Sequence, residues 1–218
     1  MVNTIRHSEF FDPSTIQEDI HIIGVGAVGS HIAEFLVRLG IEEINIWDFD
    51  VVDDHNIPNQ KFRHKDIGKK KTSALKKQLE EINPEVVVHC YQKYEDQEIN
   101  GYIFACVDNI EVRKELYESN IYNVGLKAVF DTRVALKAGQ IFSADWSNET
   151  HKDNLLAVSE FSHDEAEEDT AACGTKLAVL PTMVQVSNLA VTNFMNFIIH
   201  GELKPMITFN IFNMKFNT

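Results

Sequence analysis

Residues 20–29, with the sequence IHIIGVGAVG, decide the fold of this chain. The stretch begins with an apolar run that predicts a buried strand. Gly24, Gly26 and Gly29 then form a G-x-G-x-x-G pattern, and residues 30–39 carry apolar side chains at helical spacing. Glycines at this position let the backbone turn tightly and approach a phosphate, which the amino terminus of the following helix attracts. The stretch therefore predicts a nucleotide-binding strand–turn–helix unit.

The rest of the chain alternates apolar runs with helix-like patterns, which is typical of parallel βα units. Strands are expected over residues 20–25, 44–49, 86–91, 102–107, 127–132, 139–144 and 206–212, and helices over 30–39, 71–82, 109–122 and 175–199. We predict an α/β fold: a Rossmann-like, mostly parallel sheet flanked by helices, with antiparallel strands added in the C-terminal half. The 218 residues suit a single domain, 1–218, with an N-terminal arm (1–18) and an acidic loop (146–172).

Composition narrows the possible partners. The formal net charge of −13 argues against nucleic acid as a main partner, because an acidic protein repels the phosphate backbone. No apolar run approaches the roughly 18–20 residues of a membrane-spanning helix. Residues 1–11 lack the basic start and apolar stretch of a signal peptide. We therefore expect no membrane partner and a cytoplasmic location.

Three cysteines, Cys90, Cys106 and Cys173, form no C-x-x-C pair. Neither a disulfide framework nor a zinc site is therefore expected. Cys90 and Cys106 fall in expected buried strands, where a cysteine usually serves as a small apolar side chain.

Two acids follow the glycine loop at the distance that nucleotide binding requires. Asp48 and Asp50 stand about 20 residues further on, at the expected end of the second strand. An acid there accepts hydrogen bonds from ribose hydroxyls. These features suit an NAD enzyme as well as an ATP enzyme, so the segments that follow have to separate the two.

Those segments are NIPNQ at residues 56–60, GKKK at 68–71 and CVDNIEVR at 106–113. With the glycine loop and the D-F-D strand end at 48–50, the chain resembles the ThiF/MoeB/HesA adenylyltransferases, which share the nucleotide-binding core of ubiquitin-activating enzymes. The resemblance runs from about residue 6 to about residue 201, and its specificity comes from five motifs in one order. It implies ATP and Mg²⁺ as cofactors.

The resemblance also implies roles for the matching residues. Asp48 would bind the ribose, Asn56 and Lys71 the phosphates, and Asp108 the Mg²⁺ beside the triphosphate. Arg113 would either contact phosphates or pair with an acid. The implied nucleotide-binding set is Gly24, Gly26, Gly29, Asp48, Asp50, Asn56, Gln60, Arg63 and Arg113. The implied partner is a small ubiquitin-like or sulfur-carrier protein whose C-terminal carboxylate receives AMP.

At one position the chain departs from the family pattern. The family has Asn-x-x-Arg-Gln, but the arginine is Asn59 here, and an asparagine has no guanidinium to replace it. Lys61 or Arg63 would have to reach the same phosphate, or the adenylation step is slower or lost. This departure leaves a second hypothesis open, in which the chain is a non-catalytic relative that pairs with an active partner and serves as a scaffold. A third, an NAD-binding Rossmann protein, is disfavoured because a hydride-transfer enzyme has no use for a triphosphate–Mg²⁺ site.

Arg6 and Cys173 have roles that come from the resemblance. In the family an N-terminal arginine reaches the ATP of the other protomer, so Arg6 implies a homodimer; otherwise it is an exposed terminal arginine.

Cys173 follows the acidic segment, where many relatives have a cysteine that takes the acyl group as a thioester. A thiol at a helix amino terminus has a lowered pKa, although a packed helix start is the structural alternative. The segment 146–172 corresponds to the crossover loop above the substrate tail, or is simply solvated.

Overall fold

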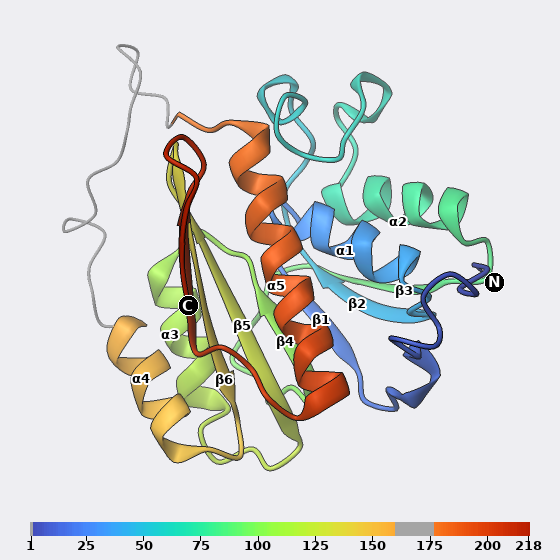
Figure 1. Ribbon diagram of the computed structural model, residues 1–218. Coiled ribbons are helices and arrows are strands. Elements are labelled where there is room, and N and C mark those ends of the chain that lie inside the picture. Colours follow the sequence, from blue (N-terminus) through green and yellow to red (C-terminus); the bar gives the residue numbers. More distant parts are fainter. Residues whose placement is uncertain (1, 160–176) are drawn as a thin grey trace.

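The computed structural model describes residues 2–159 and 177–218, in which strands and helices alternate (Figure 1). The strands are β1 (Ile20–Ile23), β2 (Glu43–Trp47), β3 (Val87–Tyr91), β4 (Gly101–Ala105), β5 (Leu126–Val134), β6 (Ala138–Asp145), β7 (Met206–Asn210) and β8 (Lys215–Asn217). The α-helices are α1 (Gly29–Arg38), α2 (Lys71–Ile82), α3 (Ile110–Ser119), α4 (Glu149–Ser159) and α5 (Leu180–His200). Short 3₁₀ helices lie at Pro13–Thr15, Asp54–Asn56 and His64–Asp66. None of these helices, within the described residues, has the length and hydrophobicity needed to cross a bilayer.

Within the described residues the eight strands form one sheet, in the order β3-β2-β1-β4-β5-β6-β7-β8. Strands β1 to β5 run parallel to one another, whereas β6, β7 and β8 each run antiparallel to the strand before. The predicted fold class is thus confirmed. The strand order reverses between β1 and β4, and the carboxyl ends of strands at such a point usually form the ligand crevice.

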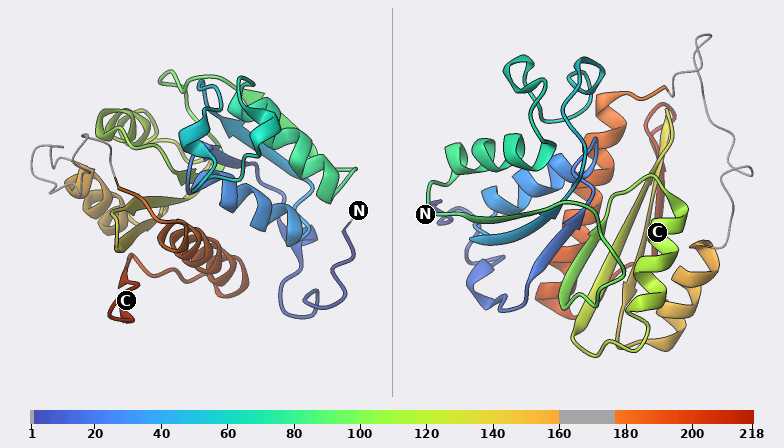
Figure 2. Two further views of the ribbon diagram at one scale, coloured as in Figure 1. Left: turned by 90° about the horizontal axis from the view of Figure 1, so that it is seen from above. Right: turned by 180° about the vertical axis from the view of Figure 1, so that it is seen from behind.

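Helices cover both faces of the sheet (Figures 1 and 2). One apolar cluster packs α1, α2 and α5 against the first face and includes the fully buried Leu36 and Phe194. A second cluster packs α3 and α4 against the other face and includes Leu116. Successive residues of β1 contribute to both clusters, Ile22 to the first and Ile23 to the second. The unbroken apolar run of the sequence is explained by this burial on both faces.

The acidic segment is where the predicted secondary structure was wrong. Part of it, Glu149–Ser159, forms α4, which packs on β6 and α3. Leu155 is buried, and so is Lys152, whose Nζ lies 2.6 Å from an oxygen of Glu149. A buried lysine among polar neighbours hides the apolar stripe that would signal a helix. Residues 160–172 of the predicted loop lie outside the described residues.

A buried histidine contributes to the second face. His21 in β1 is 9% exposed, and its Nδ1 accepts a hydrogen bond from Trp47 Nε1 at 3.3 Å. Burial lowers the pKa of His21 from 6.5 to about 4, while nearby Asp19 opposes the shift. The folded protein therefore holds His21 neutral at a pH where the unfolded chain binds a proton.

We expect the free energy of unfolding to fall on acidification because of His21. Between pH 6.5 and about 4 the unfolded state binds more protons at this residue, so stability is complete above pH 6.5 and is lost as the pH drops. The loss between pH 7 and pH 5 is about 2 kcal/mol for this group. Urea unfolding of the wild type and of His21→Gln at both pH values measures it, because groups common to both proteins cancel. The exposed His64→Gln is the control, and equal losses in wild type and His21→Gln would contradict the expectation.

Candidate functional site

The glycine loop connects β1 to α1, and two of its glycines are required by the fold. Gly24 has φ +89°, and a Cβ there would lie 2.9 Å from the carbonyl oxygen of Cys106 at the end of β4. A Cβ on Gly29 would lie 2.0 Å from the carbonyl oxygen of Gly24. Any side chain at either position would force the backbone apart. The loop is therefore built by contacts within the chain.

Gly26 differs from these two glycines. A Cβ at Gly26 would have a single neighbour within 4 Å among the described residues, Gln60 Nε2 at 4.0 Å. The fold itself thus gives no reason for a glycine at this position. The missing side chain leaves the backbone open beside the amino terminus of α1, whose N-cap Val28 makes no side-chain cap. An anion fits such a surface, because N–H groups and the helix dipole both point toward it.

Asp48 follows β2 and lies against the glycine loop. Its Oδ2 accepts a hydrogen bond from Val25 N at 2.9 Å, and its Oδ1 accepts one from Asp50 N at 2.8 Å. Burial raises the pKa of Asp48, although the nearby Lys71 ammonium and the two backbone donors act in the opposite direction. A carboxylate has about four acceptor positions, so each oxygen of Asp48 can accept one more hydrogen bond. That geometry suits a pair of ribose hydroxyls.

Lys71 is the first residue of α2, and its charge is directed inward. The side chain is 9% exposed, and its Nζ lies 2.7 Å from Asp50 Oδ2. The Lys71 charge also acts on Asp48. An ammonium has three N–H donors, so two can still reach a phosphate while the third contacts Asp50. The ion pair with Asp50 thus holds the Lys71 ammonium in place. In this structure Asp50 acts on Lys71 rather than directly on a nucleotide.

The segment around Asn56 covers the loop. Asn56 is buried, and its Oδ1 accepts a hydrogen bond from Asp53 N at 2.9 Å, which shapes the 3₁₀ helix. The side-chain oxygens of Asn59 and Gln60 are buried and have no hydrogen-bond partner among the described residues. A terminal amide can turn by 180°, so it can offer either its N–H₂ to a phosphate or its oxygen to a hydroxyl or water. Because buried amides are normally paired, the Gln60 amide, which lies next to Gly26, fits a ligand there.

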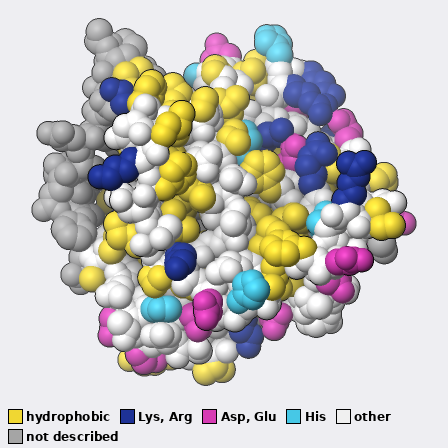
Figure 3. Space-filling model, in the orientation of Figure 1, with side chains coloured by type: hydrophobic (Ala, Val, Ile, Leu, Met, Phe, Trp, Pro, Cys, Tyr) yellow, Lys and Arg dark blue, Asp and Glu magenta, His cyan; other side chains and the backbone are white. Residues whose placement is uncertain are grey.

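The basic stretch of residues 61–71 is compensated by acids. Figure 3 shows lysine and arginine side chains gathered toward the upper right of the face that it draws. Lys61 Nζ lies 2.6 Å from Glu34, and Arg63 Nη1 lies 2.9 Å from Glu81 in the last turn of α2. Glu81 is ten residues along the helix from Lys71, which is about 15 Å. In this structure both bases are therefore paired with acids, and a phosphate contact from Arg63 or Lys61 stays a prediction.

Asp108 lies beyond the end of β4, at the same edge of the sheet as the glycine loop. It is exposed, and the preceding Cys106 donates its backbone N–H to Ile23 O of β1 at 2.8 Å. Asn109 caps α3, because its side-chain oxygen accepts a hydrogen bond from Glu111 N at 2.7 Å. Mg²⁺ needs only one or two carboxylates when phosphates and waters complete its shell. Asp108 therefore suits a metal held jointly with a triphosphate.

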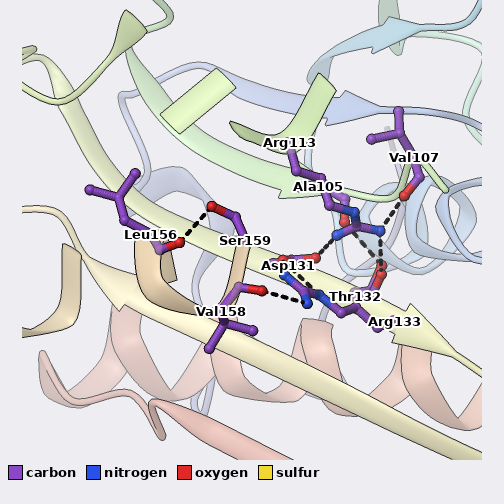
Figure 4. Close-up of polar contacts among 9 residues, drawn as sticks. All are labelled: Ala105, Val107, Arg113, Asp131, Thr132, Arg133, Leu156, Val158 and Ser159. Carbon is purple, nitrogen blue, oxygen red and sulfur yellow. Dashed lines mark hydrogen bonds and ion pairs between the residues drawn. The ribbon is translucent and has the colours of Figure 1, made fainter. Parts of the chain in front are cut away.

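Arg113 takes the second of its two predicted roles (Figure 4). It is 4% exposed and forms an ion pair with the fully buried Asp131. Its Nη2 donates to the carbonyl oxygens of Val107 and Thr132. A guanidinium held this way does not face the open loop, so the prediction that Arg113 binds the nucleotide is corrected to pairing with an acid.

The N-terminal arm lies at the opposite end of α1 from the glycine loop. His7 Nε2 lies 3.1 Å from the carbonyl oxygen of Leu39, and a Cβ on Gly40 would lie 2.6 Å from the Thr4 methyl group. Arg6 is exposed beside them, so about 15 Å of helix separates it from the loop of its own chain. Arg6 therefore does not lie at the glycine loop of its own chain in this structure.

The cysteines differ from their predicted environments. Cys90 was expected to be buried but is exposed, because β3 is an edge strand. Cys106 is partly buried, and burial raises the pKa of its thiol to about 11. Partial burial also raises the pKa of the Cys90 thiol, so neither cysteine is suited to act as a thiolate. Cys173 lies outside the described residues.

Among the described residues, one group of three side chains has its possible metal-ligand atoms close together. It consists of Asp53, Asp54 and His55, which are all exposed.

The sequence profile of the ThiF family matches residues 16–218. Ubiquitin-like modifier-activating enzyme 5 of Arabidopsis thaliana is 40% identical over 72 residues, which is 33% of this chain and 17% of that protein. The enzyme of the same name from Gallus gallus is 34% identical over 113 residues, covering 43% of this chain and 28% of that protein. The aligned part is less than a third of either relative's length.

Solved structures share the fold. E. coli MccB with ATP superposes with a TM-score of 0.70 at 17% identity, over 92% of this chain and 63% of that chain. E. coli tRNA N6-threonylcarbamoyladenosine dehydratase, TcdA, gives a TM-score of 0.69 at 16% identity, over 91% of this chain and 94% of that chain. These similarities extend over almost the whole arrangement of strands and helices described above.

Proposed function

Because this chain belongs to the ThiF family, we propose that it is an ATP-dependent adenylyltransferase. Its substrate would be the C-terminal carboxylate of a small ubiquitin-like or sulfur-carrier protein. One observation carries the proposal: the open backbone at Gly26, the Asp48 carboxylate and the Lys71 ammonium meet at one edge of the sheet. The names of the relatives support it, since one is a ubiquitin-like modifier-activating enzyme and MccB was solved with ATP.

In the proposed reaction a carboxylate oxygen of the substrate attacks the α-phosphorus of ATP. A new O–P bond forms, the bond from the α-phosphorus to the bridging oxygen breaks, and pyrophosphate leaves with that electron pair. Negative charge grows on the phosphate oxygens during this step, and the two remaining N–H groups of Lys71 stabilise it. Asp48 orients the ribose. Mg²⁺, held by Asp108, would supply further neutralisation of phosphate charge.

Two parts of the proposal concern the steps around adenylation. Cys173 is proposed to take the acyl group as a thioester, with AMP as the leaving group; the support is its place in the sequence. Arg6 is proposed to reach the nucleotide of a second copy in a homodimer. Its position at the far end of α1 supports a contact between copies rather than within one.

A second function, a non-catalytic ThiF-like half, is favoured by one observation. Asn59 replaces a positive charge, and the nearby bases Lys61 and Arg63 are paired with Glu34 and Glu81. The phosphates would then meet fewer cations than in the family pattern. The retained Lys71 and Asp108 support the catalytic reading instead.

Calorimetric titration with Mg-ATP, and with NAD under the same conditions, tests the proposal. We expect binding of Mg-ATP and none of NAD. Asp108→Asn, which keeps the side-chain shape, should reduce the gain in ATP affinity that Mg²⁺ provides by roughly tenfold, the usual scale for a metal-site change. The control is Glu111→Gln, another exposed carboxylate in the same region, which should bind as the wild type does.

Binding of NAD alone would overturn the adenylyltransferase proposal. Binding of neither nucleotide would favour the non-catalytic half, with Asn59→Arg as the variant that should recover Mg-ATP binding. A wild-type Mg²⁺ dependence in Asp108→Asn would remove the metal role of that residue while leaving ATP binding in place.

A further inference from the structure

A buried carboxylate at the carboxyl edge of the sheet interacts with two guanidinium groups (Figure 4). Asp131 in β5 is fully buried and forms an ion pair with Arg113 from α3. It also accepts hydrogen bonds from Arg133, at 2.9 Å from Nη2 and 3.2 Å from Nε. One carboxylate is enough to neutralise one guanidinium. Either arginine alone would therefore leave Asp131 compensated, and the second must have another purpose.

The two arginines extend to different elements. Arg133 donates Nη1 to Val158 O in the last turn of α4, at 3.1 Å, and its guanidinium lies over the ring of Phe142, 5.0 Å from the centroid. Arg113 instead donates Nη2 to Val107 O and to Thr132 O. Arg113 thus joins the end of β4 to the end of β5, whereas Arg133 joins β5 to α4.

Val107 is the residue immediately before Asp108 and lies beyond the last residue of β4, Ala105. The strand ladder therefore does not fix it. On the other side, Asn109 is fixed as the N-cap of α3. The residues on both sides of Asp108 are thus held in place. Asn109 is held as the N-cap of α3, and Val107 is held by the buried side chain of Arg113.

We propose that Arg113 is a positioning residue for Asp108: it fixes the Val107 carbonyl so that the neighbouring carboxylate meets Mg²⁺ in the right place. This inference rests on the proposed function, in which Asp108 holds the metal. Mg²⁺ demands near-ideal octahedral geometry, so a small displacement of its protein ligand weakens binding strongly. The forked guanidinium suits the task because it bonds two carbonyl oxygens and a carboxylate at once.

A pair of matched variants separates this role from general support of the fold. Arg113→Met and Arg133→Met each remove one guanidinium, and each leaves Asp131 paired with the other. We expect Arg113→Met to reduce the Mg²⁺-dependent gain in ATP affinity by about tenfold, as in Asp108→Asn. Arg133→Met should keep the wild-type dependence. The readout is calorimetric binding of ATP at a series of Mg²⁺ concentrations, with no turnover involved.

The double variant Arg113→Met/Asp108→Asn should lose no more than Asp108→Asn alone, because residues that act through one another are not additive. Arg113→Lys replaces Arg113→Met if that variant does not fold. Lysine keeps a positive charge beside Asp131 but lacks the forked guanidinium, so the Mg²⁺-dependent gain in ATP affinity should again fall. Wild-type Mg²⁺ dependence in the folded Arg113 variants, with a loss in Asp108→Asn, would overturn the inference and leave the proposed function standing. Equal losses in Arg113→Met and Arg133→Met would also overturn it. An unchanged dependence in Asp108→Asn would instead remove the metal role itself.

Discussion

Lys71→Ala is expected to slow substrate-dependent exchange of pyrophosphate into ATP by roughly 10²–10³-fold, the usual loss when one group that stabilises developing charge is removed. Lys71 is suited to this role because its ammonium is 9% exposed and is already directed inward by Asp50, 2.7 Å away. The charge is thus in place before the reaction begins. A cation held in a partly dehydrated site acts more strongly on phosphate oxygens than one in water.

The same contacts predict that Lys71→Ala folds. The backbone N–H of Lys71 donates to Asp50 O at 2.9 Å, and truncating the side chain leaves that bond intact. The Asp50 carboxylate is 50% exposed, so water can solvate it once the ammonium is gone. Alanine is also a good first residue for a helix. The variant should therefore unfold at nearly the wild-type urea concentration.

Lys70→Ala is the matched control for Lys71→Ala. Lys70 is the neighbouring residue and is exposed, so its charge is screened by water. We expect exchange within about twofold of the wild type in that variant. Unchanged exchange in Lys71→Ala would eliminate its catalytic role. A similar loss in both variants would mean that the basic stretch acts through its overall charge and not through one placed ammonium.

The residues whose place in the fold could be predicted are those whose position follows from the local backbone. The glycine loop, Asp48 and Lys71 each stand at the end or the start of a regular element, and the carboxyl ends of parallel strands necessarily meet at one edge. Their meeting could thus be inferred once the strands were recognised.

Long side chains were not predictable in this way. Arg63 pairs with Glu81, 18 residues away, and Arg113 with Asp131 on another element. A guanidinium spans several ångströms, so its partner depends on how the elements pack rather than on sequence spacing. For the same reason the buried Lys152 made α4 resemble a polar loop. Strand β8 was missed because all three of its residues are exposed and show no apolar alternation.

A large loss of stability is expected for Gly29→Ala. Its Cβ would lie 2.0 Å from Gly24 O, and the neighbouring backbone atom cannot move without separating α1 from the end of β1. Overpacking against backbone of this kind costs about 3 kcal/mol or more. We expect a correspondingly lower urea midpoint, and loss of Mg-ATP binding only to the extent that the protein unfolds.

Gly26→Ala should behave in the opposite way. Its Cβ has open space up to Gln60 Nε2, 4.0 Å away, so the urea midpoint should match that of the wild type. The added methyl group would nevertheless occupy the surface that a phosphate must approach closely, and Mg-ATP affinity should drop by on the order of tenfold or more, which is at least ~1.4 kcal/mol. Calorimetry on the folded variant measures this drop directly.

The comparison of the two variants locates the phosphates without a bound nucleotide. If Gly26→Ala is stable and binds Mg-ATP poorly, the glycine is there for the ligand, because no contact within the described residues requires it. If it binds Mg-ATP as the wild type does, the phosphates do not approach this backbone, and the site built on Asp48 and Lys71 must hold the nucleotide in another orientation. If Gly26→Ala is destabilised as much as Gly29→Ala, the loop is closed by packing alone, and its glycines carry no information about a ligand.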